Sequence, residues 1–585
     1  MANSLVLLFL ALFALSASAD VSIDCGAFGS YIDENIQVWM GDDDLIQTGE
    51  SKVVQSGSKV SDHIMSTLRV FTTRKKNCYT IEAAKGEQVL VRASFYYGNY
   101  DKKSAPPRFD LHFDGNYWAT VETSSEDVIS YEAIYVVKGS EISVCVAQTT
   151  PNQFPFISAL EMRRLDSNMY NHVDAQYALF LISRIAYGAN TTIRSPDDVY
   201  DRIWVPAAIG NGLTKVTSDA LLIDVNIPDD PPQAVLQNAI TTSSTSEYIV
   251  LRTNYLPTEE VPVYINMYFS EVAELDSTQN RSFLLYIDNK PESKTIVPPY
   301  GTVSEFYISN VTASSNTSFS LVATDDSTLP PFINAIEVFL ISDPLTDGTN
   351  SNDVEGLASL QSQFSVLQEW GGDPCLPASF TWDWINCSTG ARPRVTALYL
   401  SGFDLSGPLP DFSSMDALQI IDLHNNSISE EIPDFLGKFS NLKQLNLADN
   451  EFSGPVPASL SQNNKLKLDV SGNPDLCVSG KSCQTTDGTS SKLPVILGSS
   501  IPSFLVFCAI FGAVAAWHHR RKNSSYSFTQ CSPQGGTMST QMVGKMGQAV
   551  INEFKVSIEE QITSQVTNQV DEIAQNAQQQ DVRNA

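Results

Sequence analysis

The chain has 585 residues, of which 42% are hydrophobic and 17% charged, so its length and composition suit several folded domains rather than a disordered chain. The formal net charge is -30, since 66 acidic residues stand against 36 basic ones. A surface this acidic repels nucleic acid, which excludes nucleic-acid binding as a function class. We interpret most of the acidic residues as a source of solubility.

The first 19 residues are typical of a secretory signal peptide. An apolar run over 5–15 is followed by Ser16-Ala17-Ser18-Ala19, a small-residue cleavage pattern directly before Asp20. The run is too short to cross a bilayer as a helix. We therefore expect an exported chain that begins at Asp20.

A second apolar run, over 493–517, is predicted to be a transmembrane helix. It contains 25 residues without a charge, enough to cross a hydrocarbon core of about 30 Å with some tilt. Two histidines and three basic residues follow at 518–522, and such residues stay on the cytoplasmic side. The sequence predicts a single-pass type I protein of the plasma membrane, with most of the chain outside and 518–585 as a cytoplasmic tail.

The cysteines and glycosylation sequons agree with this topology. The close pairs Cys375 with Cys387 and Cys477 with Cys483 are expected to form local disulfides outside the cell. Cys25, Cys78 and Cys145 remain, an odd number, so one is expected to be free, and the sequence does not decide which two pair. Glycosylation is predicted at six sequons that precede the span: Asn190, Asn280, Asn310, Asn316, Asn386 and Asn425.

Residues 20–341 read as an all-β region, because short apolar stretches of alternating pattern are separated by Gly, Pro, Asn and Asp. The region repeats itself: Pro155-Phe156-Ile157-Ser158-Ala159-Leu160-Glu161 recurs 176 residues later as Pro331-Phe332-Ile333-Asn334-Ala335-Ile336-Glu337. A period this long indicates domain duplication. We predict two tandem β-sandwich subdomains of jelly-roll type, at about 20–165 and 170–341.

After a linker at 342–369, residues 370–483 show the leucine-rich-repeat pattern. Leu418, Ile421, Leu423 and Asn426 recur 24 residues later as Leu442, Leu445, Leu447 and Asn450. The leucines are expected to share one core, and each Asn to satisfy backbone groups where the chain turns. Phe403 stands where the first repeat should have its Asn. The two close cysteine pairs flank the repeats as caps.

Several motifs resemble the plant malectin-like receptor family, in the branch that joins a malectin-like domain to leucine-rich repeats, as in symbiosis receptor-like kinases. They include Ile23-Asp24-Cys25-Gly26, the segment Val91-Arg92-Ala93-Ser94-Phe95-Tyr96-Tyr97-Gly98-Asn99-Tyr100-Asp101, and Trp370-Gly371-Gly372-Asp373-Pro374-Cys375 before the repeats. The resemblance covers about 20–483. It departs from the family in the tail, where 518–585 contains no Gly-rich loop, V-A-I-K, H-R-D or D-F-G motif, so we expect no kinase.

The resemblance implies a carbohydrate site, because malectin binds a glucose disaccharide through aromatic faces and polar groups. The residues that match are Tyr96, Tyr97, Asn99, Tyr100, Asp101 and Trp118 in the first sandwich, and Tyr268 and Glu271 in the second. An alternative is that these residues hold strand and loop together. Some family members bind peptides or partner receptors instead.

No metal spacing is present among the six histidines, and no segment is left over for a catalytic domain, so we expect neither cofactor, metal nor enzyme activity. The sequence thus predicts a cell-surface receptor-like protein without a kinase. Its ectodomain would bind a cell-wall or di-glucose-type glycan, a kinase-bearing partner receptor, or both. The alternative is a purely protein- or peptide-binding co-receptor or decoy.

Overall fold

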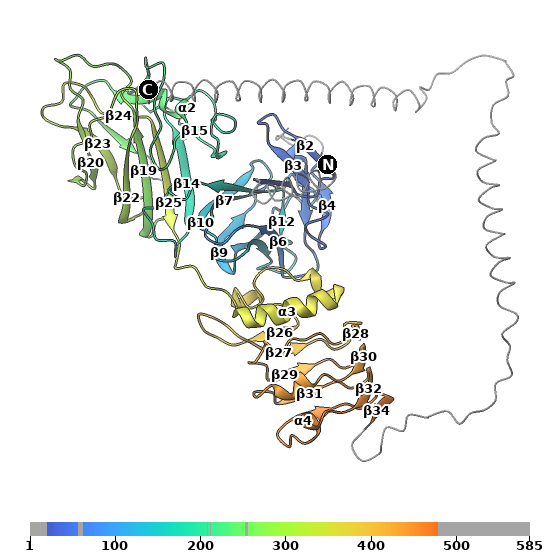
Figure 1. Cartoon of the computed structure of the whole chain (residues 1–585). Helices are drawn as coiled ribbons and strands as arrows, with labels where there is room; N and C mark the ends of the chain where they lie inside the picture. The colour runs from blue at the N-terminus through green and yellow to red at the C-terminus, as the bar shows by residue number, and fades with distance from the viewer. Residues whose placement is uncertain (1–19, 56–62, 208, 211, 252–254, 478–585) are drawn as a thin grey trace, which may run out of the picture. The chain divides into compact units, whose positions relative to one another are not determined.

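The structure is a computed structural model that describes residues 20–477, apart from 56–62, 208, 211 and 252–254. Its described part is mainly β, as predicted: two β-sandwiches are followed by a short solenoid of parallel strands (Figure 1). The predicted signal peptide and the predicted transmembrane helix at 493–517 lie outside the described residues. Among the residues that are described, no helix is long and apolar enough to cross a membrane.

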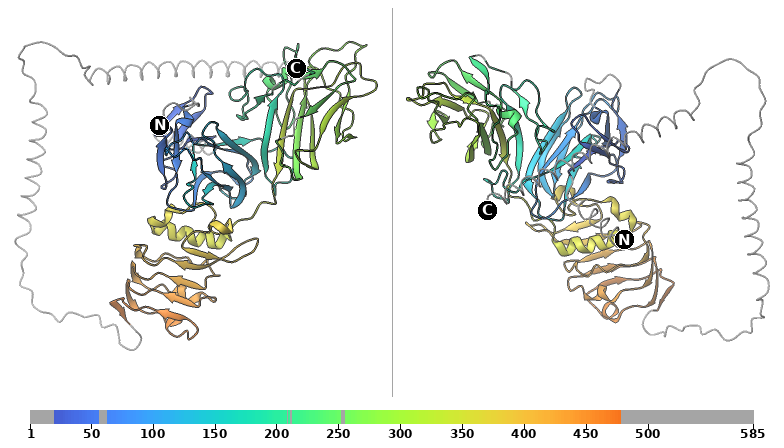
Figure 2. Two further views of the ribbon diagram at one scale, coloured as in Figure 1. Left: turned by 180° about the vertical axis from the view of Figure 1, so that it is seen from behind. Right: turned by 45° about the horizontal axis from the view of Figure 1, so that its top comes forward.

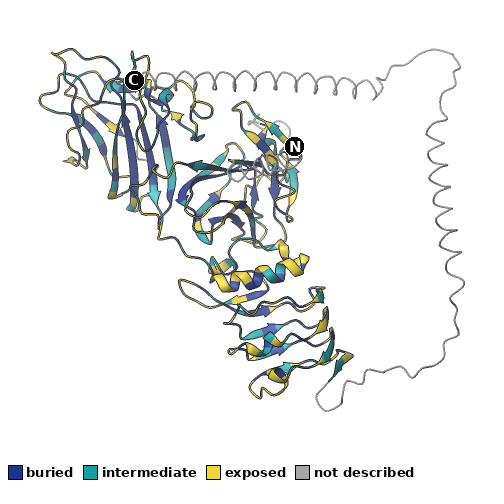
Figure 3. Cartoon of the chain, viewed as in Figure 1, coloured by how far each residue is buried: buried dark blue, intermediate teal, exposed yellow. Residues whose placement is uncertain are grey.

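The first sandwich packs a sheet of order β2-β3-β1-β13-β7-β10 against a four-stranded sheet of order β6-β11-β8-β9, with β12-β5-β4 beside them. Every residue of β7 is buried, so this strand lies at the centre of the core (Figure 3). The elements are β1 (Val21–Asp24), β2 (Ser30–Ile32), β3 (Val38–Gly41), β4 (Glu50–Val53), the 3-10 turn η1 (Ile64–Ser66), β5 (Thr67–Val70), β6 (Lys76–Glu82), β7 (Gln88–Phe95), β8 (Arg108–Phe113), β9 (Asn116–Glu122), β10 (Ile129–Val136), β11 (Glu141–Ala147), β12 (Phe156–Ile157) and β13 (Ala159–Leu165).

The second sandwich repeats this plan with β14-β25-β19-β22, β18-β23-β20-β21 and β16-β17-β24. Its core gathers aromatic and branched side chains of both sheets, among them Phe269, Phe283 and Phe319. The elements are β14 (Leu179–Ala186), β15 (Val205–Pro206), β16 (Leu213–Thr217), α2 (Gln233–Leu236), β17 (Asn238–Thr242), β18 (Tyr248–Leu251), β19 (Val261–Phe269), β20 (Phe283–Ile287), β21 (Lys290–Pro291), β22 (Ser304–Ala313), β23 (Phe319–Ala323), β24 (Phe332–Ile333) and β25 (Ala335–Ile341).

The repeated sequence motif has one structural role in both sandwiches. It forms β12 and the start of β13 in the first, and β24 and the start of β25 in the second. At the break between those strands, Ser158 Oγ accepts a hydrogen bond from Tyr96 N, and Asn334 Oδ1 accepts one from Ser270 N. The polar residue of each motif thus satisfies the backbone N–H directly after the central strand, β7 or β19.

The two sandwiches share one sheet, because β10 of the first pairs with β14 of the second (Figure 2). Only two residue pairs make this ladder, Ala133 opposite Phe180 and Ile134 opposite Leu179. Beyond them β14 pairs with β25 on one edge and with β15 on the other. A short ladder between two long strands leaves a fork, where β10 and β14 separate.

The solenoid begins with a helical cap and continues as two parallel sheets, β26-β27-β29-β31-β33 and β28-β30-β32-β34. Asn350 caps α3 by accepting a hydrogen bond from Asn352 N. The elements are α3 (Ser351–Gln363), η2 (Ser365–Glu369), η3 (Ala378–Phe380), β26 (Ile385–Cys387), β27 (Val395–Tyr399), β28 (Ser406–Pro408), β29 (Ile420–Asp422), β30 (Ser427–Glu431), η4 (Asp434–Lys438), β31 (Gln444–Asn446), β32 (Glu451–Pro455), α4 (Ala458–Ser461), β33 (Lys467–Asp469) and β34 (Asp475–Cys477).

The repeat asparagines do what the sequence predicts. Asn450 Nδ2 donates to the carbonyl oxygens of Leu423, Leu447 and Ala448, and its Oδ1 accepts from Ile428 N. Each Asn therefore binds two successive turns together. In the irregular first repeat, Phe403 instead packs against the core, with its ring 6.0 Å from that of Trp370.

Two disulfides are formed within the residues that the structure describes. Cys375 is bonded to Cys387, as predicted, and Cys78 to Cys145. Cys25 is the free cysteine of the described residues, and it is buried. Cys477 is disulfide-bonded, whereas Cys483, its predicted partner, lies outside the described residues.

The segment 370–375 is fastened to the first sandwich. Gly372 lies against the Cys78–Cys145 disulfide, and Lys76 Nζ donates to the carbonyl oxygens of Asp373 and Leu376, at 2.7 and 2.9 Å. Burial lowers the pKa of Lys76 to about 8, although Asp373 acts in the opposite direction. Arg74 stacks 3.8 Å above the ring of Trp370. The residues before the repeats thus form a docked clasp between sandwich and solenoid.

Candidate functional site at the junction of the sandwiches

A pocket of about 540 Å³ lies in the fork between β10 and β14. Its aliphatic wall comes from β14 and from the segment 203–207, which the β14–β15 pairing holds in place. Tyr255, 59% exposed, stands at its rim. The lining residues are Arg92, Ser130, Glu132, Leu181, Ile182, Ser183, Arg184, Ile185, Ile203, Val205, Pro206, Ala207 and Tyr255.

The floor of the pocket is a chain of buried ion pairs across four neighbouring strands. Arg92 Nη2 of β7 lies 2.9 Å from Glu132 Oε2 of β10. Glu132 Oε1 lies 2.7 Å from Arg184 Nη2 of β14, and Arg184 Nε lies 2.5 Å from Glu337 Oε1 of β25. Burial alone would raise the pKa of Glu132, but Arg184 and Arg92 outweigh it and hold that pKa below its ordinary value.

A second group of charges supports Arg92 from below. Arg92 Nη1 lies 3.1 Å from Glu161 Oε2, and Arg163 Nη2 bridges Glu161 and Asp201 at 2.6 and 2.8 Å. Burial acts to raise the pKa of Asp201, but Arg194 and the other arginines lower it well below the ordinary value. Since every charge has an opposite neighbour, the network can stay ionised inside the protein.

Four buried polar atoms of the residues that line the pocket make no hydrogen bond within the part of the chain that the structure describes: Glu132 Oε1, Ser183 Oγ, Arg184 Nη1 and Arg184 Nη2. Glu132 Oε1 and Arg184 Nη2 face each other as an ion pair, which leaves Ser183 Oγ and Arg184 Nη1. A buried donor without an acceptor is costly, so these two atoms are suited to an oxygen supplied from the pocket. Together with the aliphatic wall, they make a site for an apolar group that carries a carbonyl or hydroxyl oxygen.

The loop predicted to bind sugar follows β7 directly and is largely bonded to itself. Tyr97 is fully buried, and its hydroxyl donates to the carboxylate of Asp101 and, at 3.3 Å, to Asn99 Oδ1. Asn99 also accepts from Ser104 N and donates to Gln55 Oε1. Tyr100 is half-buried, with its ring 5.5 Å from that of Tyr97.

Gly98 explains part of this loop's shape. Its φ of +47 is a left-handed conformation, and a Cβ atom there would lie 2.6 Å from Val54 Cβ. Tyr96 is fully buried beside Trp39, in a small cluster that joins β3 to the end of β7. In the described conformation, the motif therefore offers the edge of Tyr100 and the carboxylate of Asp101 to solvent, rather than an open aromatic platform.

The other three predicted sugar-site residues are also buried. Trp118 is 4% exposed, and its ring stacks on Phe180. Tyr268 lies in β19 and donates from its hydroxyl to Glu337 Oε2 at 2.8 Å. Glu271 pairs with Arg281 at 2.8 Å. The structure does not bring Trp118, Tyr268 and Glu271 together with the loop at Tyr96–Asp101 into one surface, and carbohydrate binding by these residues stays a prediction.

A family model for the malectin-like domain matches residues 23–341, and one for the leucine-rich repeat matches 417–439 and 441–463. A probable leucine-rich-repeat receptor-like serine/threonine-protein kinase of Arabidopsis thaliana is 33% identical over 547 residues, which is 90% of this chain and 62% of that protein. The chain belongs to the malectin-like, leucine-rich-repeat receptor family. It spans less than two thirds of the length of that kinase.

Two other proteins are similar to this chain. An uncharacterised Arabidopsis thaliana protein is 40% identical over 351 residues, 59% of this chain and 69% of that protein. The crystal structure of the ANX2 ectodomain from Arabidopsis thaliana matches 56% of this chain and 97% of its own at 16% identity, with a TM-score of 0.49. The family supports a cell-surface receptor role. Its malectin-like and repeat modules are non-catalytic, while the relative above is a kinase, so the absence of enzyme activity here stays a prediction.

The pocket of this malectin-like protein could not be found by sequence reasoning. Its ion-pair chain joins residues that are far apart: Arg92 and Glu132 are separated by 40 positions, Arg184 and Glu337 by 153. One signal was present, since the repeated motif ends in Glu161 and in Glu337. In the structure these stand opposite Arg92 and Asn266 in equivalent ladders.

No group of three or more metal-binding side chains occurs in the described ranges.

The predicted glycosylation sites are mostly accessible. Asn190, Asn310, Asn316, Asn386 and Asn425 are exposed, whereas Asn280 is half-buried. The side-chain amide of Asn280 donates weakly to Ser282 Oγ and Asp326 O. Glycosylation itself stays a prediction at all six positions.

Proposed function

We propose that this chain is a cell-surface receptor-like protein that recognises a protein or peptide ligand in the pocket between its two sandwiches. The observation that carries the proposal is the fork itself, an aliphatic pocket above a fully buried chain of ion pairs. Such a floor is rigid, because moving any one charge would leave another buried without a partner. A rigid floor with unsatisfied donors is pre-organised for a ligand.

The lining favours a peptide over a sugar. Sugar rings stack on exposed aromatic faces, and Tyr255 is the single aromatic residue that lines the described pocket. Leu181, Ile203 and Pro206 suit an aliphatic side chain. Arg184 Nη1 and Ser183 Oγ suit the carbonyl oxygen of a peptide backbone.

We propose further that the chain is anchored by a single span at 493–517 and acts together with a kinase-bearing partner receptor. The family supports this proposal, since similar proteins are receptor-like kinases. A ligand seated at the fork would contact both sandwiches at once, so binding would stabilise one arrangement of the two. A partner receptor could bind this arrangement of the two sandwiches in preference to others.

The pocket is tested with two tyrosine variants of equal exposure. Tyr255 and Tyr248 are each 59% exposed, but Tyr255 lines the pocket and Tyr248 lies on β18. Peptides selected from a display library against the intact protein are measured for affinity to Tyr255→Ala, Tyr248→Ala and a pocket-filling Ser183→Trp. We expect loss of affinity in Tyr255→Ala and Ser183→Trp alone. Peptides that bind all three variants as well as the wild type would contradict the pocket.

Glycan binding is the second candidate, and the exposed part of the loop at 100–104 favours it. The Asp101 side chain is 21% exposed, and Lys103 Nζ lies 3.3 Å from it. An array of wall oligosaccharides and glucose disaccharides, probed with the intact protein, tests this. Binding to one defined glycan that is lost in Tyr100→Ala but kept in Tyr255→Ala would favour the loop as the site and glycan as the ligand.

A further inference from the structure

The hairpin formed by β2 and β3 exposes a run of large apolar side chains. Phe28 is 81% exposed, Ile36 69%, Ile32 67% and Val38 59%, and Met40 is also exposed. Single exposed apolar residues are common on protein surfaces. A contiguous group of them is not, and usually marks a contact with another molecule.

The strand register puts these side chains on one face. In the β2–β3 ladder Ile32 stands opposite Val38, and Ser30 opposite Met40. Tyr31 and Trp39, which alternate with them, point to the other face, where Trp39 is buried against Tyr96 and Ala159. The hairpin is thus anchored through one face and presents the other, which we call the apolar face (Ile32, Ile36, Val38 and Met40).

The backbone of the same hairpin has an open edge. β2 is the terminal strand of its sheet, and no described strand pairs with its outer side (Figure 1). Asp33 N donates to Gln37 O, and Gly41 N donates to Gly29 O. Because antiparallel ladders alternate, the N–H and C=O groups of Ser30 and Ile32 point away from β3. An incoming strand could pair with those groups.

The chain segment that contains the hairpin carries charges of one sign. No Lys or Arg occurs from Val21 to Ser51, whereas Glu34 and Asp44 are exposed and form no ion pair within the described residues. A second copy of this chain would bring these carboxylates against each other, which is unfavourable. A segment that carries Lys or Arg beside apolar residues would instead be attracted.

The edge strand at the opposite end of the sheet carries a predicted glycosylation site. β22 is the edge strand there, and the predicted glycosylation site Asn310 lies within it, exposed. A glycan attached to this strand would cover the edge and hinder the approach of a further strand. None of the six predicted sites falls in the β2–β3 hairpin, so this edge would stay accessible on the glycoprotein.

We propose that the β2–β3 hairpin docks an extended, basic segment of a partner protein, which adds to β2 as a further strand. The apolar side chains of that segment cover Ile32 and Val38, and its basic residues lie near Glu34 and Asp44. Backbone pairing with Ser30 and Ile32 fixes its register. This surface is separate from the pocket at the fork, so either can fail without the other.

The test uses two synthetic peptides and the full chain in detergent. One labelled peptide alternates valine with lysine, and the other alternates valine with glutamate. Binding is followed by fluorescence anisotropy at two salt concentrations. We expect the lysine peptide to bind, more weakly at high salt, and the glutamate peptide not to bind. Equal binding of both peptides, or of neither, would overturn the proposal.

Matched variants locate the binding. Ile32→Lys with Val38→Lys changes the apolar face, and Tyr248→Lys with Val250→Lys changes an equally exposed pair on β18, the edge strand of a second-sandwich sheet. Ile32→Pro removes one outward N–H without altering charge. We expect binding to weaken about tenfold or more in both hairpin variants. The affinity of the β18 variant should equal that of the wild type. Unchanged melting temperatures show that the variants are folded.

Two outcomes would overturn the docking surface specifically. If the lysine peptide binds the hairpin variants as tightly as the wild type, its binding reflects only the overall acidity of the chain. If the wild type self-associates in sedimentation and the hairpin variants do not, the occupant is a second copy of this chain rather than a basic partner.

Discussion

Glu132 Oε1 lies 2.7 Å from Arg184 Nη2, and this contact joins the first sandwich to the second where their backbone ladder is only two pairs long. Both side chains are almost completely buried. Each has a further partner on its own side, Arg92 for Glu132 and Glu337 for Arg184. The junction therefore depends on charge pairing as much as on the shared sheet, and the pocket is built directly above it.

Replacing Glu132 with Gln should destabilise the protein strongly. The amide keeps the shape but leaves Arg92 and Arg184 without their shared carboxylate in a buried place. Breaking a buried pair in this way costs about 3–5 kcal/mol. The measurement is the midpoint of chemical unfolding, followed by tryptophan fluorescence.

The control for that variant is Glu122→Gln, since Glu122 forms an exposed ion pair with Arg108. Exposed pairs contribute only up to about 1 kcal/mol, so this variant should unfold close to the wild type. Equal effects of the two substitutions would show that the buried chain has no special role at the junction.

The second sandwich should be more stable in mildly acidic than in alkaline solution. Burial, together with the neighbouring carboxylate of Asp229, raises the pKa of Glu305 to about 8 from an ordinary 4.5. The folded state then holds a proton that the unfolded state loses above about pH 4.5. Stability should fall as pH rises from about 4.5 towards 8, as measured by melting temperature.

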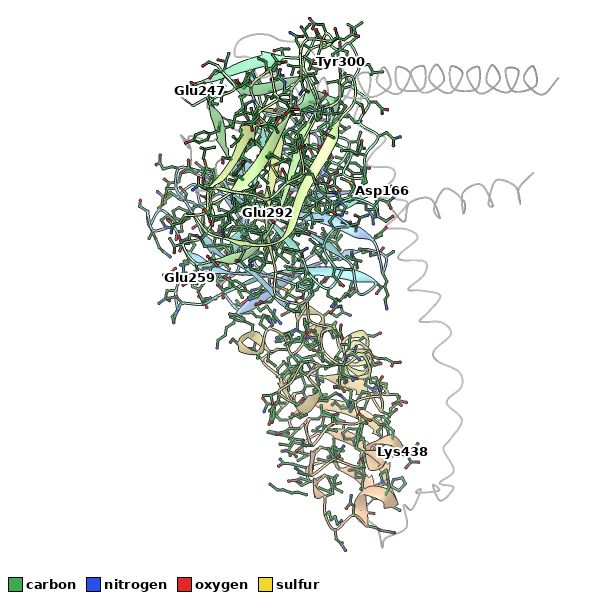
Figure 4. The ribbon with its side chains drawn as sticks, turned by 90° about the vertical axis from the view of Figure 1, so that its left-hand side faces the viewer. Asp166, Glu247, Glu259, Glu292, Tyr300 and Lys438 are labelled. Atoms are coloured by element: carbon green, nitrogen blue, oxygen red, sulfur yellow. A yellow bond between two sulfur atoms is a disulfide. The ribbon has the colours of Figure 1, made fainter. Side chains whose placement is uncertain are left out.

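Glu305→Gln isolates the contribution of this group. The amide cannot ionise, so the melting temperature of the variant should fall less between about pH 4.5 and pH 8. At pH 8 the variant should melt above the wild type. Glu247→Gln, on the exposed surface of the same sandwich (Figure 4), should leave the profile unchanged. A wild-type melting temperature that rises steadily from pH 5 to pH 8 would contradict the raised pKa.

The sequence predicts the elements of this fold whose signals are local. The repeat leucines and asparagines recur at a fixed spacing, so both the shared core and the role of Asn450 follow from the pattern. The duplicated motif likewise indicates the second sandwich, because Ser158 and Asn334 occupy one position of one strand plan. These features follow from patterns that recur along the sequence, so no tertiary contact has to be known to predict them.

The junction pocket depends on residues that only the tertiary structure brings together. Arg92 and Glu132 stand between apolar residues in their strands, a pattern typical of a solvent-facing position. Arg92 is buried because the segment that contains Asp201 lies over it, with Arg92 Nη2 donating to Asp201 O at 2.8 Å. Glu132 is buried against Arg184 of the neighbouring strand β14. The burial of Tyr97 likewise depends on tertiary contacts. Its motif can be recognised in the sequence, but its burial cannot.

A methyl group at Gly372 should loosen the clasp between sandwich and repeats. Gly372 has a φ of +67, and a Cβ atom there would lie 2.6 Å from Cys78 Sγ and 2.8 Å from Cys145 Sγ. A disulfide cannot yield easily, so Gly372→Ala must displace the segment that Lys76 holds. We expect faster limited proteolysis of the intact protein near 370–375, with Gly301→Ala as the control, since Gly301 has a similar φ of +72 but stands in open space. Identical proteolysis of both variants would mean that the clasp tolerates displacement.

Asn450→Ala should destabilise the repeats more than any exposed Asn substitution. The side chain is 4% exposed and bonds three carbonyl oxygens and Ile428 N. Removing it leaves these backbone groups buried without partners, at a cost of about 2–4 kcal/mol. Asn446→Ala is the matched control, since the Asn446 side chain makes one long contact, 3.3 Å from Ala448 N. Hydrogen exchange of the amides at 420–450 measures both: Asn450→Ala should speed exchange across neighbouring repeats, because each Asn connects two turns. An effect confined to position 450 would show instead that the turns are held independently of the asparagine ladder.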